Sequence, residues 1–159
     1  MSQSVLFVCL GNICRSPLAE AALRRECAAS ELTVIIDSAG TGDWHVGQPP
    51  DERAQATAAR NGLDIGHLRA RQVTGSDFHD FDHIIALDNQ NLRDLTAMRP
   101  MKVVAKLSLL FDHVAGRAGE DVTDPFYGEV EDFDQTWAEV TEAATTIRKL
   151  LEASQGEPI

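Results

Sequence analysis

Short apolar segments alternate with amphipathic segments along most of the chain. Four runs rich in Val, Ile, Leu and Phe have the length of buried strands: Ser4–Cys9, Leu32–Asp37, Asp82–Leu87 and Val103–Leu107. Helices are predicted between and after these runs: Ser16–Ala29, Asp51 to about Asn61–Gly62, Asn89–Met98 and Phe133–Ala153. Strands that alternate with helices pair in parallel. The pattern therefore predicts an α/β fold built on a parallel sheet.

Length and charge limit the class of protein. The 159 residues suit a single domain spanning residues 1–159, and the 43% of apolar residues suffices for a buried core. The net charge of −11 opposes binding to DNA, RNA or anionic lipid. No apolar run approaches a membrane span of about 18 residues, and no basic segment precedes Val5–Leu10, so neither membrane insertion nor a secretory signal is predicted. Three cysteines are too few for a disulfide scaffold, so we expect a cytoplasmic protein.

The segment after the first predicted strand carries the strongest chemical signal. Ligands of parallel sheets bind beyond the carboxyl ends of the strands, and this loop reads VCLGNICRSP over residues 8–17. Gly11 and Asn12 are the residue types that most readily take a positive φ, so they let the loop curl with its N–H groups inward. Ser16 is a candidate N-cap and Pro17 suits the first helical position. The unpaired N–H groups of the helix start add partial positive charge.

Such a loop forms a cup for a tetrahedral phosphate dianion, which Arg15 can close with its bidentate fork. Helix N-termini and cationic neighbours stabilise a thiolate, so Cys9 is the predicted nucleophile and would form a cysteinyl-phosphate. The Ser16 hydroxyl could hydrogen-bond that thiolate. No metal and no cofactor is expected, because the arginine and the backbone amides supply the positive charge. The predicted phosphate-binding loop comprises Leu10, Gly11, Asn12, Ile13, Cys14 and Arg15.

VCLGNICRSP resembles the active-site loop of the low molecular weight protein tyrosine phosphatases. The resemblance extends over nearly the whole chain, through DSAGTGDWHVGQPPD (Asp37–Asp51), HLRARQ (His67–Gln72), ALDNQNLRDL (Ala86–Leu95) and DPFYG (Asp124–Gly128). It implies a single three-layer domain in which helices flank a four-stranded parallel sheet. It also implies that phosphotyrosine-containing proteins are the substrates. The catalytic residues that it implies are Cys9 as nucleophile, Arg15 as phosphate binder and Asp124 as general acid and base.

Asp124 suits the task of protonating the leaving group. Hydrolysis of an aryl phosphate expels a phenolate whose conjugate acid has a pKa of about 10, so a carboxylic acid that donates a proton speeds the step. Pro125 stiffens the segment and biases Asp124 to an extended conformation, and Phe126 is expected to help desolvate the carboxyl group. An Asp-Pro pair by itself indicates a turn. The family resemblance is what assigns the catalytic role.

The resemblance also implies supporting roles. A hydrogen-bond network that holds the loop would consist of Asn12, Ser16, Ser38 and His67. Trp44 and Tyr127 would line the mouth of the cup and sandwich the substrate ring. Asp88, at the end of the third predicted strand, could hold Arg15 in place, although an aspartate there is also a common helix cap. A monomer is expected, and the sequence leaves weak self-association open.

Three alternative functions fit the sequence less well than phosphotyrosine hydrolysis. An arsenate reductase on the same fold needs a further cysteine pair, and here only Cys14 and Cys27 accompany the predicted nucleophile. A protein-arginine phosphatase carries a threonine where this chain has Ile13, whose apolar side chain suits an aromatic ring. A phosphate-binding module without catalysis would lack one of the three catalytic residues, and all three are present. Phosphotyrosine hydrolysis is the predicted activity.

Overall fold

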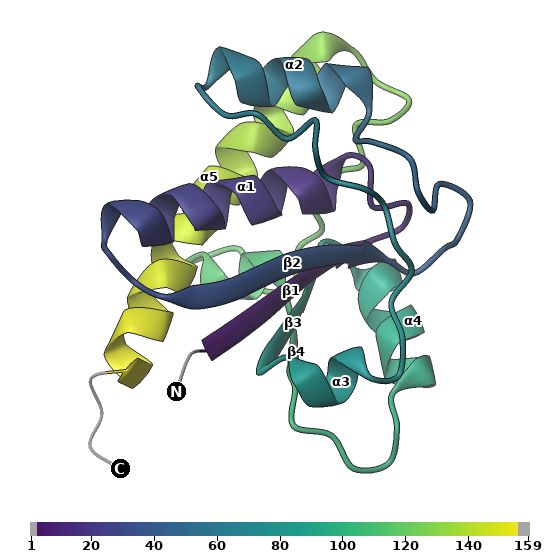
Figure 1. The fold of residues 1–159 in the computed structure, drawn as a ribbon, viewed down its shortest axis with the longest axis vertical. Helices are drawn as coiled ribbons and strands as arrows, with labels where there is room; N and C mark the ends of the chain where they lie inside the picture. Colours follow the sequence, from purple (N-terminus) through teal and green to yellow (C-terminus); the bar gives the residue numbers. More distant parts are fainter. Residues whose placement is uncertain (1–2, 156–159) are drawn as a thin grey trace.

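The computed structural model describes residues 3–155 (Figure 1). Four parallel strands form one sheet in the order β2-β1-β3-β4, which confirms the predicted α/β class. The elements, in chain order, are β1 (Gln3–Cys9), α1 (Arg15–Ala29), β2 (Val34–Gly40), α2 (Glu52–Arg60), α3 (Asp77–Asp80), β3 (His83–Ala86), α4 (Asn89–Met98), β4 (Lys106–Leu109), the 3₁₀ helix η1 (Leu110–His113) and α5 (Val130–Gln155).

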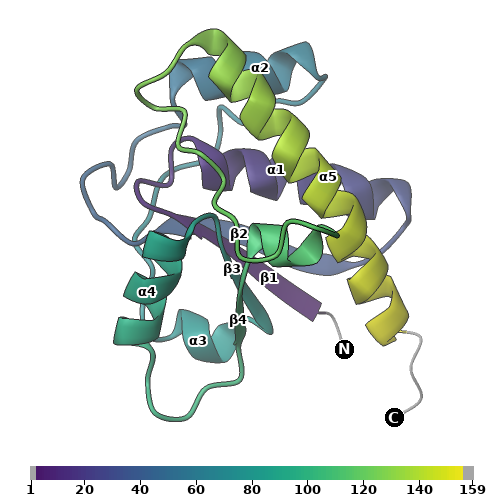
Figure 2. The same ribbon diagram turned by 180° about the vertical axis from the view of Figure 1, so that it is seen from behind.

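Helices cover both faces of the sheet. In Figure 1 and Figure 2, α1 and α5 lie on one face and α3 and α4 on the other, while α2 packs outside α1 and α5. Alternate residues of β1 pack against the two helical layers, because successive side chains of a strand point to opposite faces. Val5 and Phe7 belong to the core with α1 and α5, whereas Leu6 and Val8 belong to the core with α3 and α4. The central strand is buried from Ser4 to Cys9 as a result.

Two strands lie later in the chain than predicted. β2 begins at Val34 instead of Leu32 and continues to Gly40. β4 spans Lys106–Leu109 instead of Val103–Leu107, because its register is set by pairing with β3. The residues just before β4 follow another path, in which the N–H group of Ala105 donates to a carbonyl of α3. Short apolar runs do not reveal such a register, because pairing with a distant strand sets it.

The short helix α3 was not predicted from the sequence. Its first residue, Asp77, carries a buried carboxylate that accepts hydrogen bonds from the Thr74 N–H group and from both terminal nitrogens of Arg71. A helix of one turn has no hydrophobic period to detect. By contrast, α4 has the predicted bounds, and Asp51 is the N-cap of α2, accepting from the Arg53 N–H group.

The carboxyl ends of β1 and β3 meet at one edge of the sheet. β1 ends at Cys9, and Val8 pairs with Ala86, the last residue of β3. The N–H group of Val122 donates to the Leu87 carbonyl at 2.9 Å, which brings the segment before Asp124 to the same edge. Three separate parts of the chain therefore converge there. Within residues 3–155, no helix combines the length and the apolar character needed to cross a bilayer.

Candidate active site

The loop after β1 turns sharply through Asn12. Its φ of 57° lies in the left-handed region, as predicted for this residue type. Gly11 does not adopt a positive φ, contrary to expectation. Its missing side chain serves a different purpose, because a Cβ atom at this position would lie only 2.9 Å from Cδ2 of His45. Gly11 therefore makes room for a residue of the neighbouring loop.

The loop leaves a set of backbone donors without partners. Its carbonyl groups are bonded to neighbouring segments: those of Cys9, Leu10 and Ile13 accept at 2.9 Å from the N–H groups of residues 41, 42 and 51. By contrast, the N–H groups of Leu10, Gly11, Ile13 and Cys14 have no acceptor within residues 3–155. Unpaired N–H groups at the start of a helix form an anion-binding site. The backbone thus supports the predicted phosphate-binding loop.

Cys9 lies at the floor of this loop with 3% of its surface exposed. The N–H group of Asn12 donates to Cys9 Sγ at 3.3 Å, and Ser16 Oγ lies 3.0 Å from the same sulfur. Ser16 Oγ also accepts a hydrogen bond from Asn12 Nδ2 at 2.8 Å. Its own hydrogen is therefore free to point at the sulfur. The Asn12 N–H group and the Ser16 hydroxyl thus converge on Cys9 Sγ.

Ser16 is not the N-cap that the sequence predicts. Helix α1 begins one residue earlier, at Arg15, and its N-cap is Cys14, which forms no side-chain capping bond. Ser16 is fully buried, and its hydroxyl bonds to Cys9 and Asn12 instead. A capping role and a bond to the sulfur compete for the same oxygen. The Ser16 hydroxyl bonds within the loop, and the start of α1 has no side-chain cap.

The second loop cysteine is in a different environment. Burial raises the pKa of the Cys14 thiol well above its usual value, and the nearby carboxylate of Asp51 adds to that rise. Cys14 therefore remains a thiol near neutral pH. A nucleophilic cysteine must reach the thiolate form. Of the two cysteines in the loop, only Cys9 has the donors for that role.

Arg15 is a buried cation held by acceptors from distant segments. Its Nη1 atom donates to Asp88 Oδ2 at 2.7 Å and to the Val122 carbonyl at 2.8 Å, while Nη2 lies 3.6 Å from Asp124 Oδ2. Burial opposes the charge, but Cys9 and the two carboxylates outweigh it and raise the pKa of Arg15 above its usual value. Asp88 also caps α4, accepting from the Asn91 N–H group. Both roles considered for Asp88 are present.

A chain of buried polar side chains continues behind the loop. The Nδ2 group of Asn12 donates to Ser38 Oγ at 2.9 Å as well as to Ser16, and Asn12 Oδ1 accepts from the Arg71 N–H group at 3.0 Å. Ser38 Oγ in turn donates to Glu20 Oε1 at 2.7 Å. Every hydrogen of the Asn12 amide is used, so its orientation is determined. This network holds Asn12 in its left-handed conformation.

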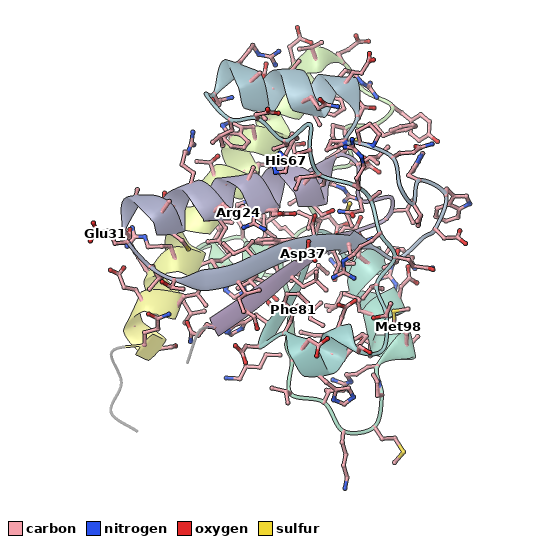
Figure 3. All side chains as sticks on the ribbon, viewed as in Figure 1. Arg24, Glu31, Asp37, His67, Phe81 and Met98 are labelled. Atoms are coloured by element: carbon pink, nitrogen blue, oxygen red, sulfur yellow. The ribbon has the colours of Figure 1, made fainter. Side chains whose placement is uncertain are left out.

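Glu20 takes the place in the network that was predicted for His67. The His67 side chain is exposed and forms no hydrogen bond to the described residues, whereas Glu20 is fully buried. Arg24 belongs to α1, and Figure 3 shows its label between α1 and β2. Its side chain donates to Glu20 Oε2 at 2.9 Å. Burial raises the pKa of the Glu20 carboxyl, against the lowering effect of the bonds from Ser38 and Arg24. The sequence carried one usable signal: Glu20 is one helical turn beyond Ser16.

The loop opens into a cavity of about 300 Å³. Trp44 and Tyr127 line it with 68% and 94% of their surfaces exposed, and their contact with a substrate stays a prediction. His45 and Phe126 also line it; the sequence predicted no role for His45 and, for Phe126, only desolvation of Asp124. Their rings and that of Tyr127 form one series, with centroids 6.4 and 4.9 Å apart. The complete lining is Cys9, Leu10, Gly11, Ile13, Cys14, Arg15, Trp44, His45, Asp124, Phe126 and Tyr127.

Asp124 lies on the cavity wall. The Phe126 N–H group donates to Asp124 Oδ1 at 3.1 Å, and the other carboxylate oxygen faces Arg15. Phe126 does not bury the carboxyl group as expected, because the Asp124 side chain is 40% exposed. The Phe126 side chain lines the same cavity instead. The carboxylate remains accessible to a substrate and to water.

Gly40 is required by the close approach of the phosphate-binding loop. A Cβ atom at this position would lie 2.7 Å from the Leu10 carbonyl oxygen and 3.2 Å from the Gly11 carbonyl carbon. We expect Gly40→Ala to displace the loop and to weaken inhibition by inorganic phosphate by about tenfold or more. The inhibition constant and the melting temperature are the measurements. Gly75→Ala is the matched control, because no atom lies within 4 Å of its new methyl group. Unchanged phosphate inhibition in Gly40→Ala would contradict this account of the loop.

Known proteins resemble this chain in both sequence and fold. The model of the family "Low molecular weight phosphotyrosine protein phosphatase" matches residues 4–156. The protein of that name from Schizosaccharomyces pombe is 40% identical over 150 residues, which are 92% of this chain and 96% of the relative. A protein tyrosine phosphatase from Entamoeba histolytica superposes with a TM-score of 0.90 at 35% identity, covering 97% of this chain and 99% of the other.

A Drosophila arginine phosphatase has a similar structure too. Its TM-score is 0.86 at 32% identity, with 96% of this chain and 99% of the other covered. The fold by itself therefore accommodates two phosphorylated residue types. The family match nevertheless extends over almost all of the sequence, and it confirms the resemblance first seen in the loop of residues 8–17. The chain belongs to the low molecular weight phosphotyrosine protein phosphatase family.

Proposed function

We propose that this protein hydrolyses phosphotyrosine in proteins through a cysteinyl-phosphate intermediate. The observation that carries the proposal is the convergence of three groups on one cavity: Cys9 Sγ with its two donors, the buried Arg15 cation, and the accessible carboxylate of Asp124. The unpaired loop N–H groups and Arg15 would bind the phosphate oxygens. Positive charge aimed at those oxygens stabilises the transition state without a metal ion.

In the first step, the Cys9 thiolate attacks phosphorus from the floor of the loop. A sulfur–phosphorus bond forms while the bond from phosphorus to the tyrosine oxygen breaks. The electron pair of the broken bond goes to that oxygen, which takes a proton from the Asp124 carboxyl group. Tyrosine leaves as a neutral phenol. Asp124 lines the same cavity as Cys9, which supports this division of roles.

In the second step, the Asp124 carboxylate takes a proton from a water molecule as the water oxygen attacks phosphorus. The sulfur–phosphorus bond breaks, and its electron pair returns to Cys9. The Ser16 hydroxyl, 3.0 Å from the sulfur, stabilises the departing thiolate. Inorganic phosphate is released and Asp124 is protonated again. One carboxyl group thus serves as acid and then as base.

The shape of the cavity favours an aryl substrate. Trp44 and Tyr127 contribute exposed aromatic rings to the lining, and Ile13 adds an apolar side chain. A flat tyrosine ring gains contact area on these surfaces. The guanidinium of a phosphoarginine would lose hydration there, and Asp124 is the one acidic residue of the lining that could compensate for that loss. The three free cysteines among residues 3–155 further support action in a reducing compartment such as the cytoplasm.

The test compares two phosphopeptides of the same sequence, one with phosphotyrosine and one with phosphoarginine, in EDTA. We expect phosphate release from the phosphotyrosine peptide and a much lower kcat/KM for the other. EDTA should leave the rate unchanged. Preference for phosphoarginine would overturn the assigned substrate class. Binding of vanadate without turnover of either peptide would point to a phosphate-binding module instead.

A further inference from the structure

Arg53 lies next to the active site but outside its cavity. It is the second residue of α2, and its guanidinium makes a two-point contact with the side chain of Asp51, the N-cap of that helix. Arg53 Nε lies 3.0 Å from Asp51 Oδ1, and Nη2 lies 3.0 Å from Oδ2. Hydrogen bonding to this carboxylate raises the pKa of Arg53 above its usual value. The Asp51 carboxylate therefore fixes the orientation of the charged, planar Arg53 guanidinium.

The remaining donors of this guanidinium reach the segment that carries Asp124. Arg53 Nη2 donates to the Phe126 carbonyl at 2.9 Å, and Nη1 donates to the Gly128 carbonyl at 3.3 Å. The guanidinium carbon also lies 5.7 Å from the centre of the Phe126 ring and 4.6 Å from that of Phe133. Figure 1 and Figure 2 show the reason: α2 runs beside the start of α5, directly after this segment.

Packing and hydrogen bonds together hold the segment Asp124–Gly128: Pro125 is buried, and Phe126 packs against the core that includes residues of α1 and α5. Its internal hydrogen bonds run from Phe126 N–H to Asp124 and from Gly128 N–H to Pro125. Within residues 3–155, Arg53 is the one residue outside the segment whose side chain hydrogen-bonds to its backbone. The contact of Asp124 with Arg15, at 3.6 Å, is long for a hydrogen bond. Arg53 thus supplies the side-chain hydrogen bonds that tie the backbone of this segment to α2.

The same helix start is joined to the phosphate-binding loop. The N–H group of Asp51 donates to the Ile13 carbonyl at 2.9 Å. A continuous path therefore runs from Ile13 through Asp51 and Arg53 to Phe126, two residues from the proposed acid. This path connects the loop that binds phosphate to the segment that must protonate the leaving group.

We propose that Arg53 is a positioning residue that holds the Asp124 segment at a defined distance from the phosphate-binding loop. The inference rests on the proposed function of Asp124 as general acid. Arg53 itself does not line the cavity and does not touch the reacting atoms. Its loss leaves the nucleophile and the phosphate site intact and misplaces the proton donor. Misplacement of a catalytic group by about 1 Å can cost up to about a hundredfold in rate.

The test uses two substrates that differ in their need for a proton. Phenyl phosphate expels a basic phenolate, whereas 2,4-dinitrophenyl phosphate expels a stable anion that needs no acid. We expect Arg53→Met to lower kcat/KM for phenyl phosphate by about tenfold and that for the dinitrophenyl ester by less than about twofold. Arg53→Lys keeps the charge, but one ammonium cannot reach Asp51 and two carbonyls together. The kcat/KM of Arg53→Lys for phenyl phosphate should lie between the values of wild type and Arg53→Met.

Arg60→Met is the matched control. Arg60 belongs to the same helix and joins it to α5 through Asp134 at 2.7 Å, far from the Asp124 segment. We expect its kinetics to match wild type. An equal loss on both substrates in Arg53→Met would overturn the proposal in favour of a general structural role. Wild-type rates in Arg53→Lys would show that charge alone matters, which also overturns it.

Asp124→Asn, run on the same substrates, separates this inference from the proposed function. A selective loss on phenyl phosphate in Asp124→Asn that is absent in Arg53→Met overturns the positioning role alone. No selective loss in Asp124→Asn overturns the general acid itself, and the positioning role with it. Selective losses in both variants, smaller in Arg53→Met, support both.

Discussion

Replacing Cys9 with serine is expected to lower kcat/KM for a phosphotyrosine peptide by at least about 10⁴-fold. A serine hydroxyl stays protonated in the environment that the loop provides, so it cannot attack phosphorus as the thiolate does. The Asn12 N–H group and the Ser16 hydroxyl would still surround the shorter side chain. Steady-state phosphate release, measured at several substrate concentrations, is the readout.

The control for this variant is Cys27→Ser. Cys27 is as buried as Cys9 but lies near the end of α1, away from the cavity. We expect Cys27→Ser to retain full activity, although its stability will fall somewhat because a buried apolar thiol becomes a hydroxyl. The Cys9→Ser protein should still bind vanadate, since Arg15 and the loop amides are unchanged. Substantial turnover by Cys9→Ser would rule out the cysteinyl-phosphate mechanism.

Asp124→Asn is expected to lower kcat/KM for the same peptide by about 10²- to 10⁴-fold. The amide matches the carboxyl group in size and can accept the hydrogen bond from the Phe126 N–H group, so the segment should keep its shape. It cannot donate a proton to the leaving phenolate. The effect should therefore fall on the rate of bond cleavage, while inhibition by inorganic phosphate changes little.

The pH profile provides the check on this role. The reactive form of the wild type needs Cys9 without its proton and Asp124 with one, so kcat/KM should be highest on the acid side of neutrality. The fall toward higher pH reports loss of the Asp124 proton, and Asp124→Asn should abolish that fall. A wild-type rate that still rises above pH 8 would contradict the pairing of acid and nucleophile.

Most of the fold could be predicted from local sequence. The central strand β1 and the helix α4 have apolar patterns and end signals that depend only on neighbouring residues, and both were found where predicted. The errors arose where distant pairing decides the outcome. β4 takes its register from β3, and α3 is a single turn whose first residue, Asp77, is held by Arg71. Neither leaves a periodic signal in the residues themselves.

By itself, the sequence determined the α/β class, and it predicted the phosphate-binding loop between Cys9 and Arg15 and, through the family resemblance, the role of Asp124. The alternation of apolar and amphipathic segments and the residues of the loop are local patterns, whereas Asp124 follows from the resemblance alone. Only the tertiary structure decided that Glu20 supports the loop in place of His67, and that Arg53 holds a segment 73 residues away at the Phe126 carbonyl. Such partners are brought together by the packing of α1 on β2 and of α2 beside the start of α5, and long-range packing leaves no local pattern from which they could be predicted.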